Sequence, residues 1–249
     1  YSASATVSIT VNAVNDAPVA DDQDVSTDED TPLAITMTGS DVDGDNLTFT
    51  VISGPSNGSY DGTTYTPGTN FNGSDSFTFE ASDSEYSASA TVSITVNAVN
   101  DAPTIELPES LIFEEDGDLT EDFSGYLSDI DEDELTLTVS GNESISVSID
   151  GFIVTFGAVP DWYGTETLTF TVNDNQGRAI ASDDIDINVA PVNDDPVLTE
   201  IGSQETSEDM PLVLTLEATD VDEDILTYSA ASEQPNNVSV NITDNQLTL

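Results

Sequence analysis

The stretch Tyr86–Pro103, which reads YSASATVSITVNAVNDAP, decides the fold, and the same eighteen letters open the chain as Tyr1–Pro18. Its centre alternates apolar residues with Thr and Ser, as in TVSITV at Thr6–Val11. Such alternation predicts a β-strand with one face in a core and the other in water. An exact internal duplication predicts a repeat architecture. We interpret this segment as the last strand of one repeat plus the linker into the next.

The linker phrase Val-Asn-Asp-X-Pro divides the chain into units, because it occurs at Val14–Pro18, Val99–Pro103 and Val192–Pro196. The segments between these marks have the size of a small β-sandwich. We therefore predict the last strand of a preceding repeat at 1–13, complete repeats at 14–98 and 99–191, and an incomplete repeat at 192–249.

This division predicts that the chain is a window cut from a longer tandem array. The alternative is that the opening strand completes the incomplete third repeat of a neighbouring molecule by strand addition.

Period-2 patterns predict strands throughout both complete repeats, and Gly- and Asn-rich breaks such as Gly54–Gly58 and Asn70–Gly73 predict turns. The expected fold is all-β, with tandem seven-stranded antiparallel β-sandwiches of immunoglobulin or cadherin type in a linear array. The first repeat predicts strands at 19–27, 33–39, 46–52, 58–60, 63–66, 76–81 and 87–98. The second predicts strands at 111–113, 135–140, 145–149, 152–156, 167–173 and 180–189.

The charge is extreme, since 50 acidic residues face a single basic one, Arg178, for a formal net charge of −49. Nucleic acid is excluded as a partner, because phosphate recognition needs Lys and Arg. No stretch approaches the roughly 20 apolar residues of a membrane span, so we expect no direct membrane insertion in this segment. Self-repulsion must be relieved by disorder or by cations. The regular apolar alternation argues against disorder.

One kind of acidic cluster falls on the loop between the second and third strands of each repeat. Alternating carboxylates on a short loop present several hard oxygens to one point, which suits the six to eight oxygen ligands of Ca²⁺. The likeness to an EF-hand loop is superficial, because the twelfth position from Asp41 is Ile52 and a strand follows. The predicted ligands of this kind are Asp41, Asp43 and Asp45, then Asp129, Asp131 and Asp133, then Asp220, Asp222 and Asp224.

Strand direction predicts that further acids from distant parts of the sequence converge on these loops at the joints between repeats. The acidic clusters before the second strand contribute Glu29 and Glu115, and the linkers contribute Asn15, Asp16, Asn100, Asp101, Asn193 and Asp194. The turns flanking the sixth strand contribute Asp75, Asp83, Glu166 and Asp174. Two like charges 4 Å apart cost about 1 kcal/mol in water and roughly 4 kcal/mol at a dielectric of 20. We infer that a bound metal ion neutralises the repulsion between these carboxylates and makes each joint between repeats rigid.

The linker VNDAP, the DED before strand 33–39, the DVDGD loop and the Phe71–Gly73 stretch together resemble the cadherin-like and Ig-like tandem repeats of bacterial surface adhesins. The resemblance covers essentially the whole chain. It implies Ca²⁺ between successive domains, held by an acidic group at the base of one domain, the linker, and an Asp-X-Asp pair on the next. The second repeat has Asp-Glu-Asp where the first has Asp-Gly-Asp. The Asp-Arg-Glu motif of cadherins is absent from the sequence. One to three ions per joint are compatible with this pattern.

Several blander interpretations compete with a metal site. Acidic residues in turns are often only solvated turn formers, and halophilic adaptation predicts scattered acids rather than clustered ones. Trp162–Tyr163 has two interpretations: an exposed platform that binds a sugar, or rings that close the bottom of the core, which is the commoner role of aromatic residues at such a turn. Paired carboxylates also occur in glycoside hydrolases, but we expect no enzyme here, since the acids lie in solvated linkers. Arg178 is expected to pair with Asp183 or Asp184.

The function that the sequence favours is an extracellular structural spacer or fibre segment of a bacterial adhesin or surface filament, stiffened by Ca²⁺. The expected partners are the neighbouring repeats of the same chain, with possible self-assembly into fibres. The alternative is a glycan- or protein-binding module of a secreted protein, for which Trp162–Tyr163 is the only aromatic candidate.

Overall fold

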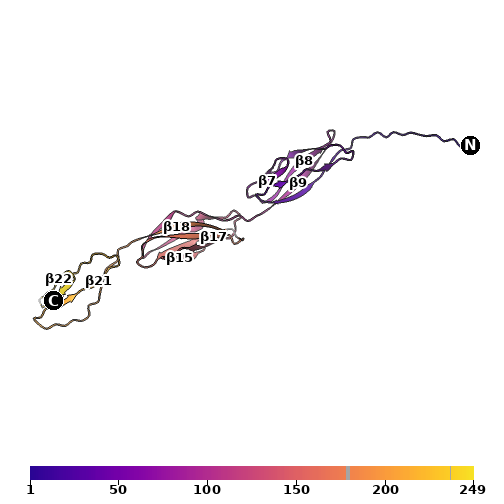
Figure 1. The fold of residues 1–249 in the computed structure, drawn as a ribbon. Helices are drawn as coiled ribbons and strands as arrows, with labels where there is room; N and C mark the ends of the chain where they lie inside the picture. The colour runs from indigo at the N-terminus through magenta and orange to yellow at the C-terminus, as the bar shows by residue number, and fades with distance from the viewer. Residues whose placement is uncertain (178–179, 236) are drawn as a thin grey trace. The chain divides into compact units, whose positions relative to one another are not determined.

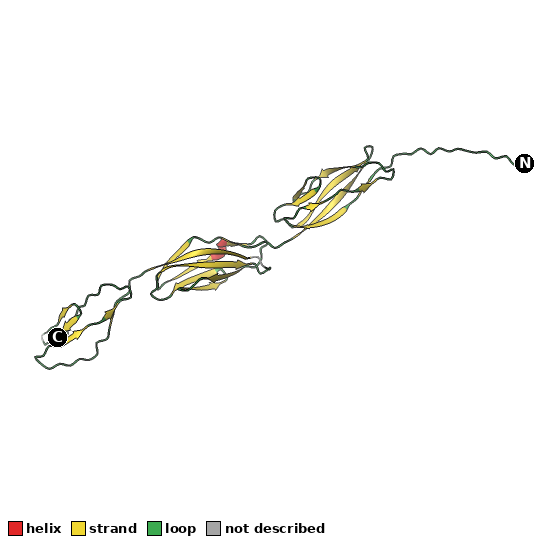
Figure 2. Cartoon of the chain, in the orientation of Figure 1, coloured by secondary structure: helices red, strands yellow, loops and turns green. Residues whose placement is uncertain are grey.

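A computed structural model describes residues 1–177, 180–235 and 237–249. The chain divides into two compact units, Tyr1–Asp101 and Ala102–Leu249. Nearly all the regular structure is β-strand, as Figure 2 shows in yellow. Among the described residues no helix has the length and apolarity to cross a bilayer.

The first unit contains one β-sandwich, which we call the first sandwich. Its larger sheet has the strand order β2-β9-β8-β5 and its smaller sheet the order β3-β7-β6, while β1 pairs with β4. The strands are β1 (Val19–Ala20), β2 (Gln23–Asp28), β3 (Leu33–Ala34), β4 (Gly39–Ser40), β5 (Thr48–Ser53), β6 (Gly58–Tyr60), β7 (Thr64–Pro67), β8 (Gly73–Ser82) and β9 (Ser87–Asn97).

The second unit contains the second sandwich and a smaller C-terminal segment. The sheets of the second sandwich have the orders β11-β18-β17-β14 and β12-β16-β15, and β10 pairs with β13. Figure 1 labels β15, β17 and β18, which run along this sandwich. Its elements are β10 (Thr104–Ile105), β11 (Ser110–Glu114), β12 (Asp118–Asp122), η1 (Phe123–Tyr126), β13 (Leu127–Ser128), β14 (Thr136–Ser140), β15 (Ile145–Asp150), β16 (Ile153–Ala158), β17 (Gly164–Asn173) and β18 (Ile180–Ala190). The C-terminal segment pairs β19 (Val197–Leu198) with β21 (Ala218–Thr219), and orders β20 (Val213–Thr215), β23 (Gln246–Thr248) and β22 (Asn241–Thr243) in a second sheet.

The expectation of purely antiparallel sandwiches is wrong at one strand pair in each sandwich. Strand β2 runs parallel to β9, and β11 runs parallel to β18. The cause is that the strand predicted at 19–27 is really two strands, β1 and β2, in different sheets. The chain crosses between the sheets at Asp21–Asp22, where the Asp22 carboxylate accepts the backbone N–H of Thr91 at 2.7 Å. After the crossing, the chain direction places β2 alongside β9 with the same polarity.

The alternating pattern of the duplicated segment buries one face of β9. Val92, Ile94 and Val96 lie in the core, whereas Ser93 and Thr95 between them are exposed. This confirms the predicted division into a core face and a water face at β9, whereas the identical copy at Thr6–Val11 forms no strand and is exposed along its whole length, contrary to the strand predicted there. In the second sandwich, three rings form the centre of the core: the Phe123 centroid lies 4.9 Å from that of Phe170 and 6.1 Å from that of Phe156. Phe123 belongs to the short helix η1, which the sequence did not predict and which Asp122 caps by accepting the Ser124 N–H at 2.9 Å.

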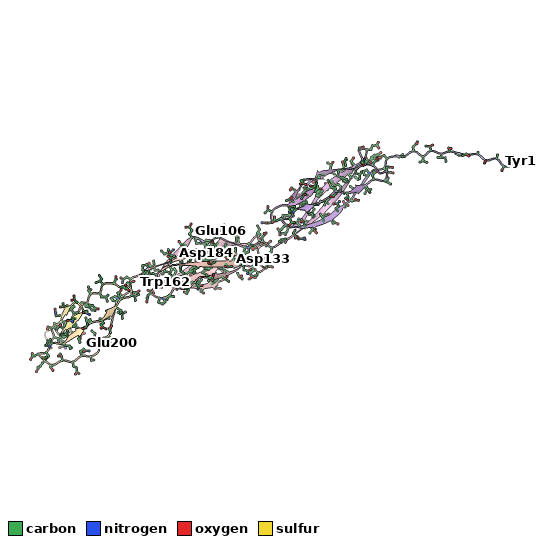
Figure 3. The ribbon with its side chains drawn as sticks, in the orientation of Figure 1. Tyr1, Glu106, Asp133, Trp162, Asp184 and Glu200 are labelled. Carbon is green, nitrogen blue, oxygen red and sulfur yellow. The ribbon has the colours of Figure 1, made fainter. Side chains whose placement is uncertain are left out.

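An aromatic-X-Gly turn closes the same end of both sandwiches. Gly164 has a φ of +146°, and a Cβ there would lie 3.3 Å from Cζ2 of Trp162. Gly73 has a φ of +127°, and a Cβ there would lie 3.6 Å from Cζ of Phe71. Both rings pack against their cores. The interpretation of Trp162 as a ring that closes the bottom of the core is therefore confirmed, and its neighbour Tyr163 is exposed. Figure 3 labels Trp162 in the second sandwich.

We predict that Phe170→Ala destabilises the second sandwich by about 3–5 kcal/mol, because it leaves a cavity among buried rings. Urea unfolding followed by tryptophan fluorescence reports on this sandwich, since the chain has a single Trp, which packs against this core. Thr171→Ala, on the opposite face of β17, is the matched control and should change stability by about 0.5 kcal/mol or less. Equal losses from the two variants would contradict this account of the core.

Candidate metal centre

The three Asp-X-Asp-X-Asp loops share one local geometry. Oδ1 of the first Asp accepts the backbone N–H groups of the second and third: for Asp41 the distances are 2.8 Å to Asp43 and 3.3 Å to Asp45. The Asp129 and Asp220 loops repeat both bonds within 2.9–3.3 Å. This Asx-type turn folds the loop back on itself, and in the first two loops it brings one oxygen of each Asp within 4.8 Å of the others.

The residue between the second and third Asp adopts a left-handed conformation in every loop. Its φ is +82° at Gly44, +60° at Glu132 and +59° at Glu223. Glycine takes this conformation freely and other residues take it at a cost. Because Glu132 and Glu223 adopt it all the same, the change from Asp-Gly-Asp to Asp-Glu-Asp leaves the geometry of the loop intact.

Within each unit, one linker lies against the Asp loop that follows it. The backbone N–H of Asp16 donates to Oδ2 of Asp43 at 2.8 Å, and Nδ2 of Asn15 donates to Oδ2 of Asp83 at 2.9 Å. In the second unit the N–H of Asp194 makes the equivalent bond to Oδ2 of Asp222 at 2.6 Å. We call this the incoming end. The structure thus brings together the linker, loop and turn residues that the sequence placed there.

At the opposite, outgoing end, a buried glutamate holds the departing chain. Glu29 and Glu115 are 4% and 3% exposed. Oε1 of Glu29 accepts the N–H of Val99 at 2.6 Å, and Oε1 of Glu115 accepts the N–H of Val192 at 2.7 Å. These short bonds fix the direction in which the linker leaves each sandwich.

Within the second unit, acids from both sides of a joint meet at Asp194. One oxygen each of Asp116, Asp161 and Asp194 lie within 4.8 Å of one another. Withdrawal from water raises the pKa of Asp194 above its ordinary value, and the carboxylates of Asp116, Asp161, Asp222 and Glu115 raise it further. The residue therefore lies where the negative fields of the second sandwich and the C-terminal segment add.

Asp116 and Asp161 were missed as site residues by the sequence reasoning. Asp116 directly follows Glu115, and Asp161 lies in the turn before Gly164. Both adopt left-handed conformations, with φ of +63° and +60°. The signal that could have found Asp161 is the aromatic-X-Gly turn, which aligns it with Asn70 of the first sandwich.

Two predicted ligands have another role. Asp75 is 8% exposed, and its carboxylate accepts the N–H groups of Ser56, Ser76 and Asn57 at 2.8–3.0 Å and the Tyr65 hydroxyl at 3.0 Å. Glu166 accepts three backbone N–H groups, those of residues 143–145, at 2.7–3.4 Å. Neither residue belongs to an acidic cluster within the described ranges. Both act as anchors for a loop, because their oxygens are turned to backbone donors.

The remaining predicted residues are placed as follows. Asp174 is 1% exposed and its Oδ1 accepts the N–H of Gln176 at 2.9 Å. The Gln176 amide donates to Oδ1 of Asp133 at 3.1 Å, so this turn and the Asp129–Asp133 loop lie side by side. The linker amides repeat one contact: Nδ2 of Asn100 donates to the carbonyl of Asp101, and Nδ2 of Asn193 donates to that of Asp194. The predicted partnership of Arg178 lies outside the described residues.

The donor set fits a hard divalent cation. Oδ2 of Asp41, of Asp129 and of Asp194 is buried, and within the described part of the chain it has no hydrogen-bond partner. A buried charged oxygen without a partner is costly. Carboxylate and backbone oxygens are the ligands that Ca²⁺ takes. These residues are therefore able to hold such an ion, and the orphaned oxygens indicate where it would bind.

A model of the bacterial Ig domain matches residues 15–95 and 100–189. Among solved structures, human CDH23 EC21-23 is 16% identical with a TM-score of 0.53, over 83% of this chain and 80% of that one. Human Protocadherin-24 EC1-2 is 16% identical with a TM-score of 0.50, over 70% of this chain and 99% of that one. These likenesses show the fold. No curated protein matches the sequence.

A third similar structure is an endo-fucoidan hydrolase of glycoside hydrolase family 107, which is 24% identical with a TM-score of 0.30. The match covers 74% of this chain, and the chain spans 30% of the length of that enzyme.

We predict that Asp75→Asn destabilises the first sandwich by about 1–3 kcal/mol and leaves cation affinity unchanged. Burial alone raises the pKa of Asp75, but the backbone and Tyr65 donors outweigh it and hold the pKa below its ordinary value. The stabilisation is therefore present above the ordinary pKa and lost as pH falls through the folded-state value. Thermal unfolding and Ca²⁺ calorimetry measure the two effects. A weakened Ca²⁺ affinity would return Asp75 to the metal site.

We predict that Asp194 titrates above its ordinary pKa of 3.8 in metal-free protein. A raised folded-state pKa means that its contribution to stability is present below the ordinary value and lost as pH rises through the folded value. Carboxyl-carbon NMR measures the midpoint directly. Asp116→Asn should lower it, whereas Asp184→Asn, in the middle of β18, should not. A midpoint at or below 3.8 would contradict the convergence of acids at this joint.

Proposed function

The chain belongs to the bacterial Ig domain family, and we propose that it is a structural spacer of a bacterial adhesin or surface filament whose joints are made rigid by Ca²⁺. Domains of this family and cadherin-like domains are typically extracellular and non-enzymatic. In this proposal the partners of each sandwich are its neighbours along the chain.

The observation that carries the proposal is the orphaned Oδ2 of Asp194. This atom is buried in the joint. There, one carboxylate oxygen of Asp194 lies within 4.8 Å of one oxygen of Asp116 and one of Asp161, both in the second sandwich. The backbone N–H of the same residue is bound to Asp222 of the C-terminal segment. One linker residue is therefore bound to one side of the joint and lies near the acids of the other. A cation bound there would tie the two sides together and neutralise their repulsion.

The acids elsewhere on the molecule support this interpretation by contrast. On the outer face of the second sandwich, Thr167 Oγ1 donates to Asp186 at 2.6 Å and Thr169 Oγ1 donates to Asp184 at 2.7 Å. These sheet acids are exposed and have hydroxyl partners. General acidity of the surface does not explain why the carboxylates at the joints have buried oxygens instead.

The alternative of a glycan- or protein-binding module has lost its main candidate. It depended on Trp162–Tyr163 as an exposed platform, but the Trp162 ring packs into the core. A spacer needs no such platform. Its requirements are repeated domains, short linkers and solvated faces, and the Ser- and Thr-rich outer faces of β8, β9 and β17 supply the last of these.

We predict that calcium lengthens and stiffens the chain in solution and that a chelator reverses the effect. Small-angle scattering measures the maximum dimension in about 10 mM Ca²⁺ and in EGTA. Extracellular sites bind at roughly 10⁻⁴–10⁻³ M, so each occupied site should also add about 1.4–2.7 kcal/mol to stability through mass action. Asp131→Ala should weaken the calcium response while both sandwiches stay folded.

The matched control is Asp184→Ala, which removes a carboxylate from the middle of β18 rather than from an end; Figure 3 places Asp184 between Asp133 and Trp162. Its calcium response should equal that of the parent chain. Identical scattering with calcium and with chelator, in a chain that is folded in both, would overturn the proposal.

A further inference from the structure

Resting on the proposed function, we infer that the outgoing ends of the two sandwiches bind calcium with unequal affinity, because Asp161 supplies a carboxylate where Asn70 supplies a neutral amide. The outgoing end of the second sandwich is then the tight site and that of the first sandwich is the weak one. As calcium falls, the outgoing end of the first sandwich releases its ion before that of the second.

The two ends have the same backbone. Trp162 N–H donates to the Val159 carbonyl at 3.0 Å, and the equivalent Phe71 N–H donates to the Gly68 carbonyl at 3.1 Å. The residue before each aromatic is left-handed, with φ of +60° at Asp161 and +52° at Asn70. The adjacent ring is anchored in the core in both cases. The turn therefore holds its side chain at a fixed place, and only the chemistry at that place differs.

The buried glutamate and the residue after it also correspond at the two ends, whereas the linkers differ, because Asp195 stands where the first linker has Ala102. Glu29 and Glu115 are both buried and both accept a linker N–H, at 2.6 and 2.7 Å. Asp30 and Asp116 follow them with φ of +55° and +63°. The exchange of Asn70 for Asp161 is thus one charge difference between ends that share a glutamate and a turn, and the reciprocal variants below isolate it from the exchange of Ala102 for Asp195.

At the second sandwich the carboxylate of Asp161 lies near another carboxylate that has an unpartnered oxygen. Asp161 lies in the cluster that contains Asp194, whose buried Oδ2 has no hydrogen-bond partner within the described part of the chain. Three carboxylates at that distance repel one another without a cation and attract a divalent one strongly. Calcium affinity in protein sites is tuned by the count of charged ligands and by the rigidity of the site. An extra carboxylate on a rigid turn therefore raises affinity.

The structure provides a separate reporter for each end. The Val99 amide is bound to Glu29 and the Val192 amide to Glu115. Their backbone resonances in a calcium titration of the whole 249-residue chain give one midpoint for each end. We expect the Val192 midpoint to lie roughly tenfold or more below the Val99 midpoint, the ratio that follows from about one unit charge near a divalent ion.

Reciprocal variants test the assignment. Asp161→Asn should raise the Val192 midpoint roughly tenfold and leave that of Val99 in place, while Asn70→Asp should lower the Val99 midpoint. Both changes preserve the turn, since Asn and Asp each adopt the left-handed conformation. Asp184→Asn removes the same charge from the middle of a strand and should move neither midpoint.

The outcomes separate the two proposals. If calcium moves neither amide resonance and a chelator changes nothing, the spacer proposal fails and this inference fails with it. If calcium binds and stiffens the chain but Asp161→Asn behaves like Asp184→Asn, only the inference is overturned. Equal midpoints for Val99 and Val192 in the parent chain would overturn it as well.

Discussion

The structure depends on backbone N–H groups that hold carboxylates in place at the ends of the sandwiches. Asp41, Asp129 and Asp220 each accept two N–H groups from their own loop. Hydrogen bonds to charged groups contribute about 1.5–3 kcal/mol, more than neutral ones. That is enough to keep like charges together against a repulsion of about 1 kcal/mol per close pair in water. Without these donors the acids would turn outward and no clusters would persist.

The same chemistry also removes carboxylates from the candidate site. Asp75 and Glu166 lie at the correct end of their sandwiches, yet both accept several backbone N–H groups and so anchor loops. Asp194 is the opposite case, because its contact with Asp222 uses its own N–H, and its buried Oδ2 has no hydrogen-bond partner among the described residues. What distinguishes the candidate ligands from the anchors is therefore an oxygen left without a donor, since both oxygens of Asp75 and of Glu166 are bound.

That distinction explains how far the sequence could be read. The alternation in β9, β8 and β17 predicted strands and their core faces correctly, because period 2 follows directly from strand geometry. It did not reveal that β2 runs parallel to β9, since periodicity carries no information about the partner strand. The roles of Asp75 and Asp161 were also hidden, because donors and acids that converge on them come from distant residues. Only alignment of the two aromatic-X-Gly turns would have brought Asp161 forward.

The linker of the second unit couples binding to orientation. Val192 N–H is bound by Glu115 on one side, and Asp194 N–H is bound by Asp222 on the other, with a single residue between them. A connection this short leaves few orientations in which both bonds are made. A cation that uses Asp194 together with acids from either side prefers those orientations, and a ligand shifts an equilibrium by its differential affinity for the two states. If a cation binds there, its affinity and the orientation of this joint are coupled, so a change of a single carboxylate that alters the affinity would also alter how firmly the joint is held.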